Sequence, residues 1–266
     1  MKHQSVFGFL LFAVLSCAAQ NAPSTNSSIL YDNFNHPFLD PSKWSTAPAC
    51  YADNGAEQEC VRHITSGKLY LAHRNYGNAN SDSGFQFGSA SVAFTNPSTI
   101  RSITAEVTIK NYVEVPCAAN PGFGGSAHID ATFFNTGTGN PSDDVGGHFG
   151  IGRSFSDPPD QLSVFGQIDQ GNNYFFYLFL GNVTIGTPVA ATLTWDQPNH
   201  QFVVIWTNLK TNVTTSATMP YSFGDTTPPT NAAKVLTTNT FPTNCTAAPS
   251  WMYMEATFDN VYVGLK

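Results

Sequence analysis

Apolar and polar residues alternate along one short segment after another in this chain. In the segment 103–110, Ile, Ala, Val and Ile alternate with Thr, Glu, Thr and Lys. The segment 128–133 shows the same alternation. A period of two is the spacing at which side chains of a β-strand share one face. No apolar stripe at helical spacing is found after the N-terminal region, so the pattern predicts an all-β protein.

Further strands are expected at regular intervals, and turn-forming residues separate them. They are expected at 67–73, 89–95, 147–153, 161–168, 173–180, 189–196, 201–207 and 251–264. The segment Tyr174 to Leu180 is apolar on both faces, which predicts a central strand covered on both sides. The Gly- and Pro-rich stretches 135–146 and 220–232 are expected to be loops. So many short strands favour a two-sheet antiparallel β-sandwich of the jelly-roll kind.

The first 19 residues have the three-part layout of a secretory signal peptide. Lys2 precedes an apolar run from Val6 to Leu15, and small residues follow up to Ala19. The apolar run is too short to span a bilayer, so no transmembrane span is expected. We expect a disordered segment over 20–28 and a single sandwich domain over 29–266. The protein is therefore expected to be exported, either free or lipid-anchored through Cys17, whose surroundings resemble a bacterial lipobox.

Four cysteines remain after the signal segment, and four cysteines allow three pairings. We favour Cys50 with Cys60 and Cys117 with Cys245. The second bridge would close a loop of more than about 100 residues, a length at which the chain-entropy model gives about 4 to 5 kcal/mol of stabilisation. A zinc site made of these cysteines is disfavoured because no Cys-x-x-Cys spacing is present.

The charge of the chain is low and acidic. Only 11% of residues are charged and the formal net charge is −7. This balance argues against nucleic acid as a partner, because phosphate backbones are bound by basic surfaces. Aromatic residues make up 13% of the chain, enough for a core and for stacking on a ligand. We expect the protein to be a monomer.

Three segments resemble parts of the concanavalin A-like lectin/glucanase domains. Tyr31-Asp32-Asn33-Phe34 and the following Leu39-Asp40-Pro41-Ser42-Lys43-Trp44 resemble their first strand and turn, and Glu255 to Val263 resembles their closing strand. The segment from Ala191 to Val204 is similar to their late hairpin. The resemblance implies that the first and last strands lie side by side and that a concave sheet carries a sugar-binding or catalytic groove. The Glu-x-Asp-x-x-Glu motif of the laminarinase-type hydrolases is absent, which disfavours that enzyme family.

Side chains alternate between the two faces of a strand, and this alternation places several polar and aromatic side chains on the face opposite the apolar one. If these strands were neighbours in one concave sheet, the side chains would meet in one groove. The candidate catalytic groups are Glu106, Asp130 and Glu255, and the candidate ligand-binding residues are His128, His148, Trp251 and Tyr253. Paired carboxylates can act as acid and base or nucleophile in glycoside cleavage, whereas the same groups at another spacing would only hydrogen-bond a sugar.

Two metal sites are alternatives. His128 and Asp130 point to the same side of one strand and could ligate a metal with His148 as a third ligand. Separately, Asp32 and Asp259, together with Asp143 and Asp144, are conceivable calcium ligands because hard cations bind several oxygens.

The sequence therefore favours an exported carbohydrate-binding β-sandwich protein of unknown ligand. One alternative is a polysaccharide-cleaving glycoside hydrolase or lyase, and another is a non-catalytic structural or adhesive surface protein. No Gly-x-Ser-x-Gly elbow, His-Glu-x-x-His motif, phosphate-binding loop or dinucleotide fingerprint is found, so acyl transfer, zinc proteolysis and nucleotide chemistry are disfavoured.

Overall fold

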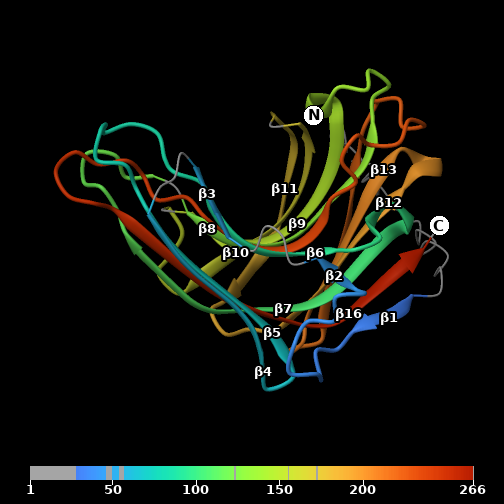
Figure 1. Ribbon diagram of the computed structural model, residues 1–266, viewed down its shortest axis with the longest axis horizontal. Coiled ribbons are helices and arrows are strands. Elements are labelled where there is room, and N and C mark those ends of the chain that lie inside the picture. Colours follow the sequence, from blue (N-terminus) through green and yellow to red (C-terminus); the bar gives the residue numbers. More distant parts are fainter. Residues whose placement is uncertain are drawn as a thin grey trace, which may run out of the picture.

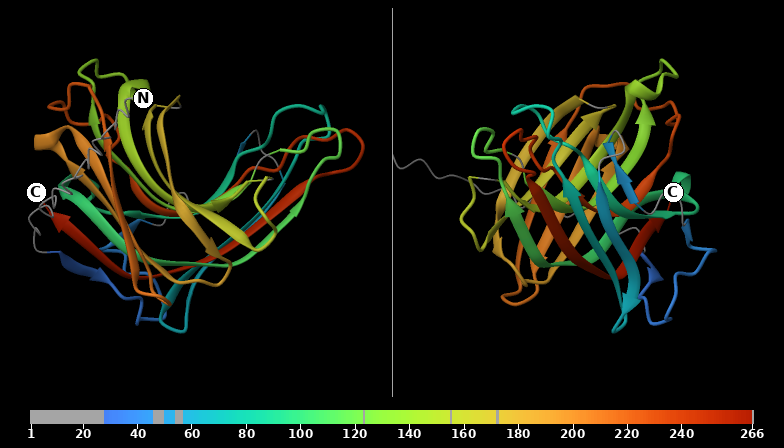
Figure 2. Two further views of the ribbon diagram at one scale, coloured as in Figure 1. Left: turned by 180° about the vertical axis from the view of Figure 1, so that it is seen from behind. Right: turned by 60° about the vertical axis from the view of Figure 1, so that its left-hand side comes forward.

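The computed structural model describes residues 28–45, 50–53, 57–122, 124–154, 156–171 and 173–265. The expected signal peptide at 1–19, the lipobox cysteine and most of the expected disordered segment at 20–28 lie outside these residues. The described chain folds into two antiparallel β-sheets packed face to face, which confirms the predicted sandwich (Figure 1). Both sheets are curved, so one is convex and the other lines a broad hollow, as the further views in Figure 2 also show.

We call the two layers the convex sheet and the concave sheet. Within the described residues each has eight strands. The convex sheet runs in the order β14 (Val213–Pro220), β13 (Gln201–Asn208), β12 (Val189–Asp196), β7 (Ile100–Val115), β16 (Trp251–Leu265), β5 (Lys68–Tyr76) and β4 (Gln58–Thr65), with β1 (Ile29–Asp32) also paired to β16. The concave sheet runs in the order β11 (Asn173–Thr184), β10 (Gln161–Gln170), β9 (Asp144–Arg153), β8 (Gly125–Asn135), β15 (Lys234–Thr240), β6 (Gly88–Phe94) and β2 (Trp44–Ser45), with β3 (Cys50–Ala52) also paired to β6.

The core lies between the two sheets and is formed by the apolar residues of the alternating segments. On β7, Ile103, Ala105, Val107 and Ile109 are at most 1% exposed, while the polar residues between them face outward. Ile129 on β8 faces them from the concave sheet and is fully buried. Burying one such aliphatic side chain contributes roughly 1.5 to 3 kcal/mol, so this layer holds the two sheets together.

The first and last described strands lie side by side, as the resemblance implied. β1 pairs with β16, and Ile29 stands opposite Val263. Trp44 at the edge of the concave sheet is buried, and its indole Nε1 donates to the Asp32 carboxylate at 2.7 Å. This contact ties the end of β1 to the other sheet.

Both expected disulfides are present. Cys50–Cys60 joins β3 of the concave sheet to β4 of the convex sheet. Cys117–Cys245 links the segment after β7 to the segment after β15, across 128 residues of sequence. The two bridges therefore join segments that are attached to different sheets.

The strand predicted to be central is an edge strand. β11 pairs only with β10, at one end of the concave sheet. Tyr177 and Phe179 on this strand are 56% and 53% exposed, so the outward face of β11 is apolar but uncovered. The prediction was wrong because apolar residues on both faces can mean a second packed layer or an exposed aromatic surface, and periodicity does not separate the two.

The helices of the described chain are single 3-10 turns. They are η2 (Pro97–Thr99), η3 (Pro141–Asp143) and η4 (Gln197–Asn199), and each has a proline in its first two positions. Among the described residues, none of the helices has the length and apolar character needed to cross a membrane.

Candidate functional site

The polar cluster expected from strand parity is divided between the two sheets. β7 and β16 pair with each other in the convex sheet, and Asp259 stands opposite Glu106. β8 and β9 pair with each other in the concave sheet, and Asp130 stands opposite His148. The single groove expected from the sequence is therefore not formed. The alternation of side chains shows which face of a strand a residue occupies, but not which sheet the strand joins.

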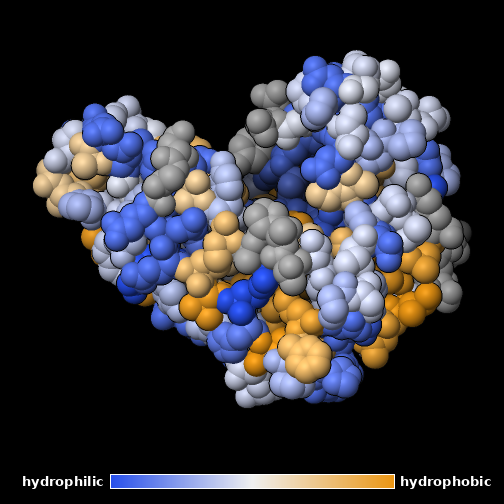
Figure 3. Space-filling model, in the orientation of Figure 1, coloured by the Kyte–Doolittle hydropathy of each residue, from blue (hydrophilic) through white to orange (hydrophobic). Residues whose placement is uncertain are grey.

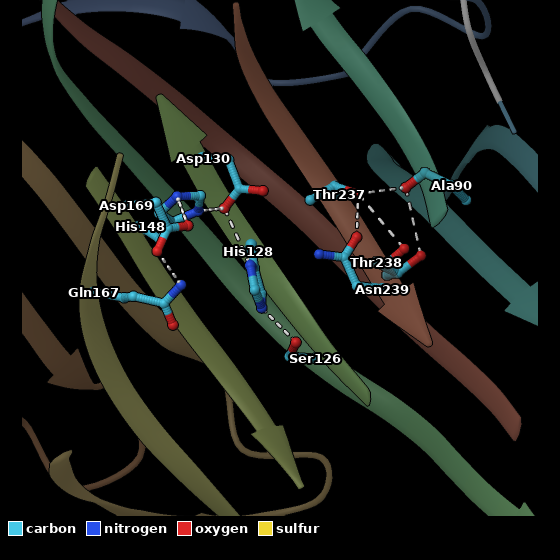
Figure 4. Close-up of polar contacts among 10 residues, drawn as sticks. All are labelled: Ala90, Ser126, His128, Asp130, His148, Gln167, Asp169, Thr237, Thr238 and Asn239. Atoms are coloured by element: carbon cyan, nitrogen blue, oxygen red, sulfur yellow. Dashed lines mark hydrogen bonds and ion pairs between the residues drawn. The ribbon is translucent and has the colours of Figure 1, made fainter. Parts of the chain in front are cut away.

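The outer face of the concave sheet, which lines the hollow, brings five polar side chains together (Figure 4). The register places Asp130 of β8 opposite His148 of β9, and His148 opposite Gln167 of β10. His128 lies two residues before Asp130 on β8, and Asp169 lies two residues after Gln167 on β10, on the same face and on opposite sides of this row. Because these strands are central neighbours in one sheet, the backbone holds the cluster in place.

His148 is clamped between two carboxylates. Its Nδ1 lies 2.7 Å from Asp130 Oδ1 and its Nε2 lies 2.7 Å from Asp169 Oδ2. Burial opposes a charge on the ring, but the two neighbouring carboxylates outweigh it and raise the pKa of His148 to about 10. The imidazole is therefore a cation at neutral pH, and both of its N–H groups donate to carboxylates.

Asp130 carries the negative charge in the middle of the cluster. Burial opposes its ionisation, but the adjacent His148 and His128 rings hold the pKa of this carboxyl well below its usual range. Both histidines contact the same oxygen, Oδ1, with His128 Nδ1 at 3.1 Å. The second oxygen, Oδ2, has no hydrogen-bond partner among the described residues, and the side chain is 21% exposed. Asp130 therefore keeps an acceptor for a ligand.

The remaining groups of the cluster hold one another. Gln167 Nε2 donates to Asp169 Oδ1 at 2.7 Å. The Ser126 hydroxyl contacts His128 Nε2. On the other side of β8, Thr237 of β15 stands opposite His128 and donates to Asn239 Oδ1 at 3.0 Å. The polar surface thus extends across four strands, from β10 to β15.

Glycines on β9 shape the face beside His148. Gly146, Gly150 and Gly152 occupy alternate positions on this side of the strand. A Cβ at Gly150 would lie 2.3 Å from the end of the Phe165 ring, which is too close for a real contact. The glycine therefore lets Phe165 lie flat over the strand, and the ring stands edge-on to His128 with centroids 5.5 Å apart.

An aromatic surface continues from Phe165 toward the edge of the sheet. Phe165 stacks on Tyr177 of β11, with ring centroids 5.4 Å apart and an angle of 26° between the ring planes. Phe179 is on the same strand face, two residues further on. We call Phe165, Tyr177 and Phe179 the aromatic platform. It borders the charged cluster directly.

A small open pocket adjoins the cluster on its other side. Its volume is about 240 Å³, and it is lined by Thr132, Pro141, Asp144, Gly146, His148, Asp169, Gly171 and Asn231. The space-filling view shows hydrophilic residues in the hollow between the two raised ends of the molecule (Figure 3). Asp144 at the pocket rim accepts from the backbone N–H groups of Thr230 and Asn231, both at 2.9 Å. These bonds fix the loop that follows β14 next to the face.

Sequence reasoning missed five residues of this face, namely Phe165, Gln167, Asp169, Tyr177 and Phe179. The signal for three of them was present, because Phe165, Gln167 and Asp169 alternate with the buried or packed residues of β10. Tyr177 and Phe179 carried no such signal, since an exposed aromatic residue and a buried one look the same in a sequence.

The other predicted site residues lie on the outer face of the convex sheet, in two separate sets of contacts. The Arg74 guanidinium lies over the rings of Trp251 and Tyr253, 5.2 and 5.7 Å from their centroids. The Tyr253 hydroxyl donates to Glu255 at 3.1 Å, and Glu106 accepts from Asn260 at 2.9 Å. Arg74 therefore covers the rings expected to stack on a ligand.

Two of the acidic residues suggested as calcium ligands, Asp32 and Asp259, contact other groups of the protein. The Asp32 carboxylate accepts from Trp44 Nε1 and from the Phe34 N–H at 2.9 Å. Asp259 forms a 2.7 Å ion pair with Lys68. Asp32 thereby holds the end of β1, and Asp259 ties β16 to Lys68 of β5.

Comparison with known proteins gives similarity at the level of the fold. No protein-family model and no curated protein sequence matches the chain. Among solved structures it is similar to the winged bean acidic lectin complexed with methyl-α-D-galactose (TM-score 0.40, 12% identity, 89% of this chain and 98% of that one). It is also similar to lectin II from Ulex europaeus (TM-score 0.36, 10% identity, 80% and 98%).

A third structure of this kind is the CBM2 module of the evolved Dit of Lactobacillus casei BL23 phage J-1 (TM-score 0.39, 10% identity, 84% of this chain and 93% of that one). At these identities the likeness concerns strand arrangement, and the chemistry of this chain has to be argued from its own residues.

Proposed function

We propose that the outer face of the concave sheet binds a carbohydrate chain without cleaving it. The observation that carries this proposal is the aromatic platform, in which Tyr177 and Phe179 are more than half exposed beside a fixed set of polar groups. Exposed aromatic side chains gathered on a concave face mark a binding surface more often than a packing accident.

The chemistry of the face suits a sugar. A pyranose ring has flat C–H faces that can pack on an aromatic ring, and its rim carries hydroxyl groups. Phe165 and Tyr177 offer flat rings, and Tyr177 combines an apolar body with a polar tip. Asp130 Oδ2 can accept from a sugar hydroxyl beside them. Charge-assisted hydrogen bonds of this kind are stronger than neutral ones.

The charge of the face favours neutral sugars over acidic ones. Asp130 and Asp169 contribute two carboxylates, and the His148 cation offsets only one of them. Placing a uronate or sulfate beside an unpaired carboxylate would be repulsive at this short range. We therefore expect neutral polysaccharides to bind more tightly than acidic ones.

The arrangement of protons argues against cleavage by this cluster. His148 is not available as a general base, because both of its nitrogens are already hydrogen-bonded to carboxylates. The free Oδ2 atom of Asp130 could accept a proton or attack, but cleavage of a glycosidic bond also needs an acid. A general acid must hold a proton near neutral pH, whereas the pKa of Asp130 is lowered. The polysaccharide-cleaving alternative is therefore a weaker hypothesis than binding, and product analysis tests it.

Export of the protein forms part of the proposal. The N-terminal segment has the layout of a signal peptide, and two disulfides fit an oxidising compartment. An exported protein that binds polysaccharide would act outside the cytoplasm, free or lipid-anchored through Cys17, and we expect it to act as a monomer.

The experiment is a polysaccharide pull-down and glycan-array screen of the purified protein, with and without calcium, followed by product analysis of every binder. We expect retention on at least one neutral glycan, no released oligosaccharides and no effect of calcium. Released oligosaccharides would favour the enzyme alternative. Failure to bind any neutral, acidic or amino-sugar glycan would contradict the proposal and favour the structural or adhesive role.

A further inference from the structure

We propose that His128, Asp130 and His148 form a binding site for one divalent transition-metal ion, with Zn²⁺ as its simplest probe. One ligand atom from each residue, an imidazole nitrogen of each histidine and a carboxylate oxygen, lies within 4.8 Å of the others. Both Nδ1 atoms face the same oxygen of Asp130, at 3.1 and 2.7 Å. An ion placed among these three atoms would be bound by two nitrogens and one oxygen.

The orientation of the two rings supports this inference independently. The Nε2 atom of His148 contacts Asp169, and the Nε2 atom of His128 contacts the Ser126 hydroxyl. Histidines that bind metals nearly always have their other nitrogen held by a carboxylate, carbonyl or water, which fixes the ring toward the ion. Here both far nitrogens are held, and both near nitrogens point to one place.

The backbone supplies a rigid base for the site. Asp130 and His148 stand directly opposite each other on β8 and β9, which are inner strands of the concave sheet. His128 lies two residues from Asp130 on the same face, opposite Gly150. Gly150 has no side chain, so the Phe165 ring of β10 occupies the space beside it and stands edge-on to His128.

The donor set selects the class of ion. Imidazole nitrogen with a single carboxylate suits Zn²⁺ and related transition ions, whereas Ca²⁺ and Mg²⁺ prefer sites built from oxygen. Binding would replace the hydrogen-bonding proton between His148 and Asp130 with the ion. Three protein ligands leave a fourth coordination position, and side-chain exposures of 10%, 21% and 19% place it toward the hollow. A water or a sugar hydroxyl could occupy that position.

The test is a Zn²⁺ titration of the protein, purified without a histidine tag, in competition with a chromophoric chelator. We expect one bound Zn²⁺ that is lost in His128→Ala and in His148→Ala. His63→Ala is the matched control, because His63 is exposed on the convex sheet, away from the cluster, and should leave binding unchanged. Asp169→Asn should weaken binding roughly 10- to 100-fold, because of the three proposed ligand residues Asp169 contacts only His148, at its far nitrogen.

Circular dichroism of each variant shows whether it is folded, and X-ray absorption of the wild-type complex gives a second readout that needs no variant. Two imidazoles in the zinc shell would support the site. Equal zinc binding by wild type, His128→Ala and His148→Ala, or a zinc shell without two imidazoles, would overturn it. No glycan is present in these measurements, so the metal site can fail while carbohydrate binding holds, and the reverse.

Discussion

Asp130 and His148 stand opposite each other on neighbouring strands, and their side chains meet at 2.7 Å on the outer face of the concave sheet. Each is about one-fifth exposed, so the pair is only partly shielded from water. Around it the fold places a second carboxylate, a second imidazole and an aromatic platform. The proposals on carbohydrate binding and on the metal site both depend on this pair and its neighbours.

Replacement of His148 by alanine should destabilise the fold. The substitution leaves Asp130 and Asp169 close together without the cation that separates them. Removing one member of a buried ion pair costs about 3 to 5 kcal/mol, and we expect roughly 2 to 4 kcal/mol here because the groups are partly exposed. Urea denaturation measures the loss. Adding Asp130→Asn to the variant should recover part of it, and no recovery would show that the carboxylates do not repel.

A buried histidine in the other sheet should set the acid limit of stability. Burial lowers the pKa of His73 to about 4 from its ordinary value of 6.5. The folded state therefore favours the neutral ring, and this contribution is complete above pH 6.5. It declines as the pH falls from 6.5 to 4, by about 3 kcal/mol in total. The difference in unfolding free energy between wild type and His73→Gln should be largest at pH 6.5 and should shrink as the pH falls toward 4. Parallel curves would contradict the assignment.

Glycine 150 should be needed for the aromatic platform. An alanine Cβ would stand 2.3 Å from the end of the Phe165 ring, so the ring must leave the position in which it stacks on Tyr177. We expect Gly150→Ala to weaken glycan binding while reducing stability by about 1 to 3 kcal/mol. The control is Gly224→Ala, because a Cβ there meets only a backbone oxygen at 3.8 Å. If Gly150→Ala bound the glycan as wild type does, Phe165 would not be part of the binding site.

The two disulfides should contribute unequally to stability. Cys117–Cys245 spans 128 residues and Cys50–Cys60 spans 10. In the chain-entropy model the longer loop stabilises by about 4 to 5 kcal/mol and the shorter one by less than about 3 kcal/mol. Denaturation of the Cys117→Ser/Cys245→Ser and Cys50→Ser/Cys60→Ser variants compares them. A larger loss from the short bridge would show that native contacts, rather than loop entropy, dominate.

The sequence was a good guide to the strands and a poor guide to their neighbours. The alternation from Ile103 to Ile109 predicted a half-buried strand, because side-chain direction depends only on local backbone geometry. Five strands were not predicted, namely the short β2 and β3 and the longer β4, β14 and β15. β14 has mostly polar residues on its exposed face, and β15 is rich in threonine and asparagine, so neither shows a clear apolar face.

The candidate site was predicted only in part, for a related reason. His128, Asp130 and His148 were singled out correctly as a group that shares one face, because they lie on two strands joined by a short connection. Glu106 and Glu255 were grouped with them, although their strands belong to the other sheet. Contacts between residues far apart in the sequence decide which sheet a strand joins, and the pattern of a single strand does not indicate these contacts.

The most direct test of the account is a calorimetric titration with a neutral oligosaccharide that the glycan screen identifies as a ligand. It is titrated into wild type, into the double variant Tyr177→Ala/Phe179→Ala and into Phe38→Ala. Phe38 is 68% exposed and lies between β1 and β2, whereas the platform is on β10 and β11 at the other end of the concave sheet from β2, so Phe38 is a matched exposed aromatic residue. We predict that the double variant loses at least 10-fold in affinity, about 1.4 kcal/mol, while Phe38→Ala binds as wild type does. Equal affinity of all three proteins would contradict the proposal that the aromatic platform binds the carbohydrate.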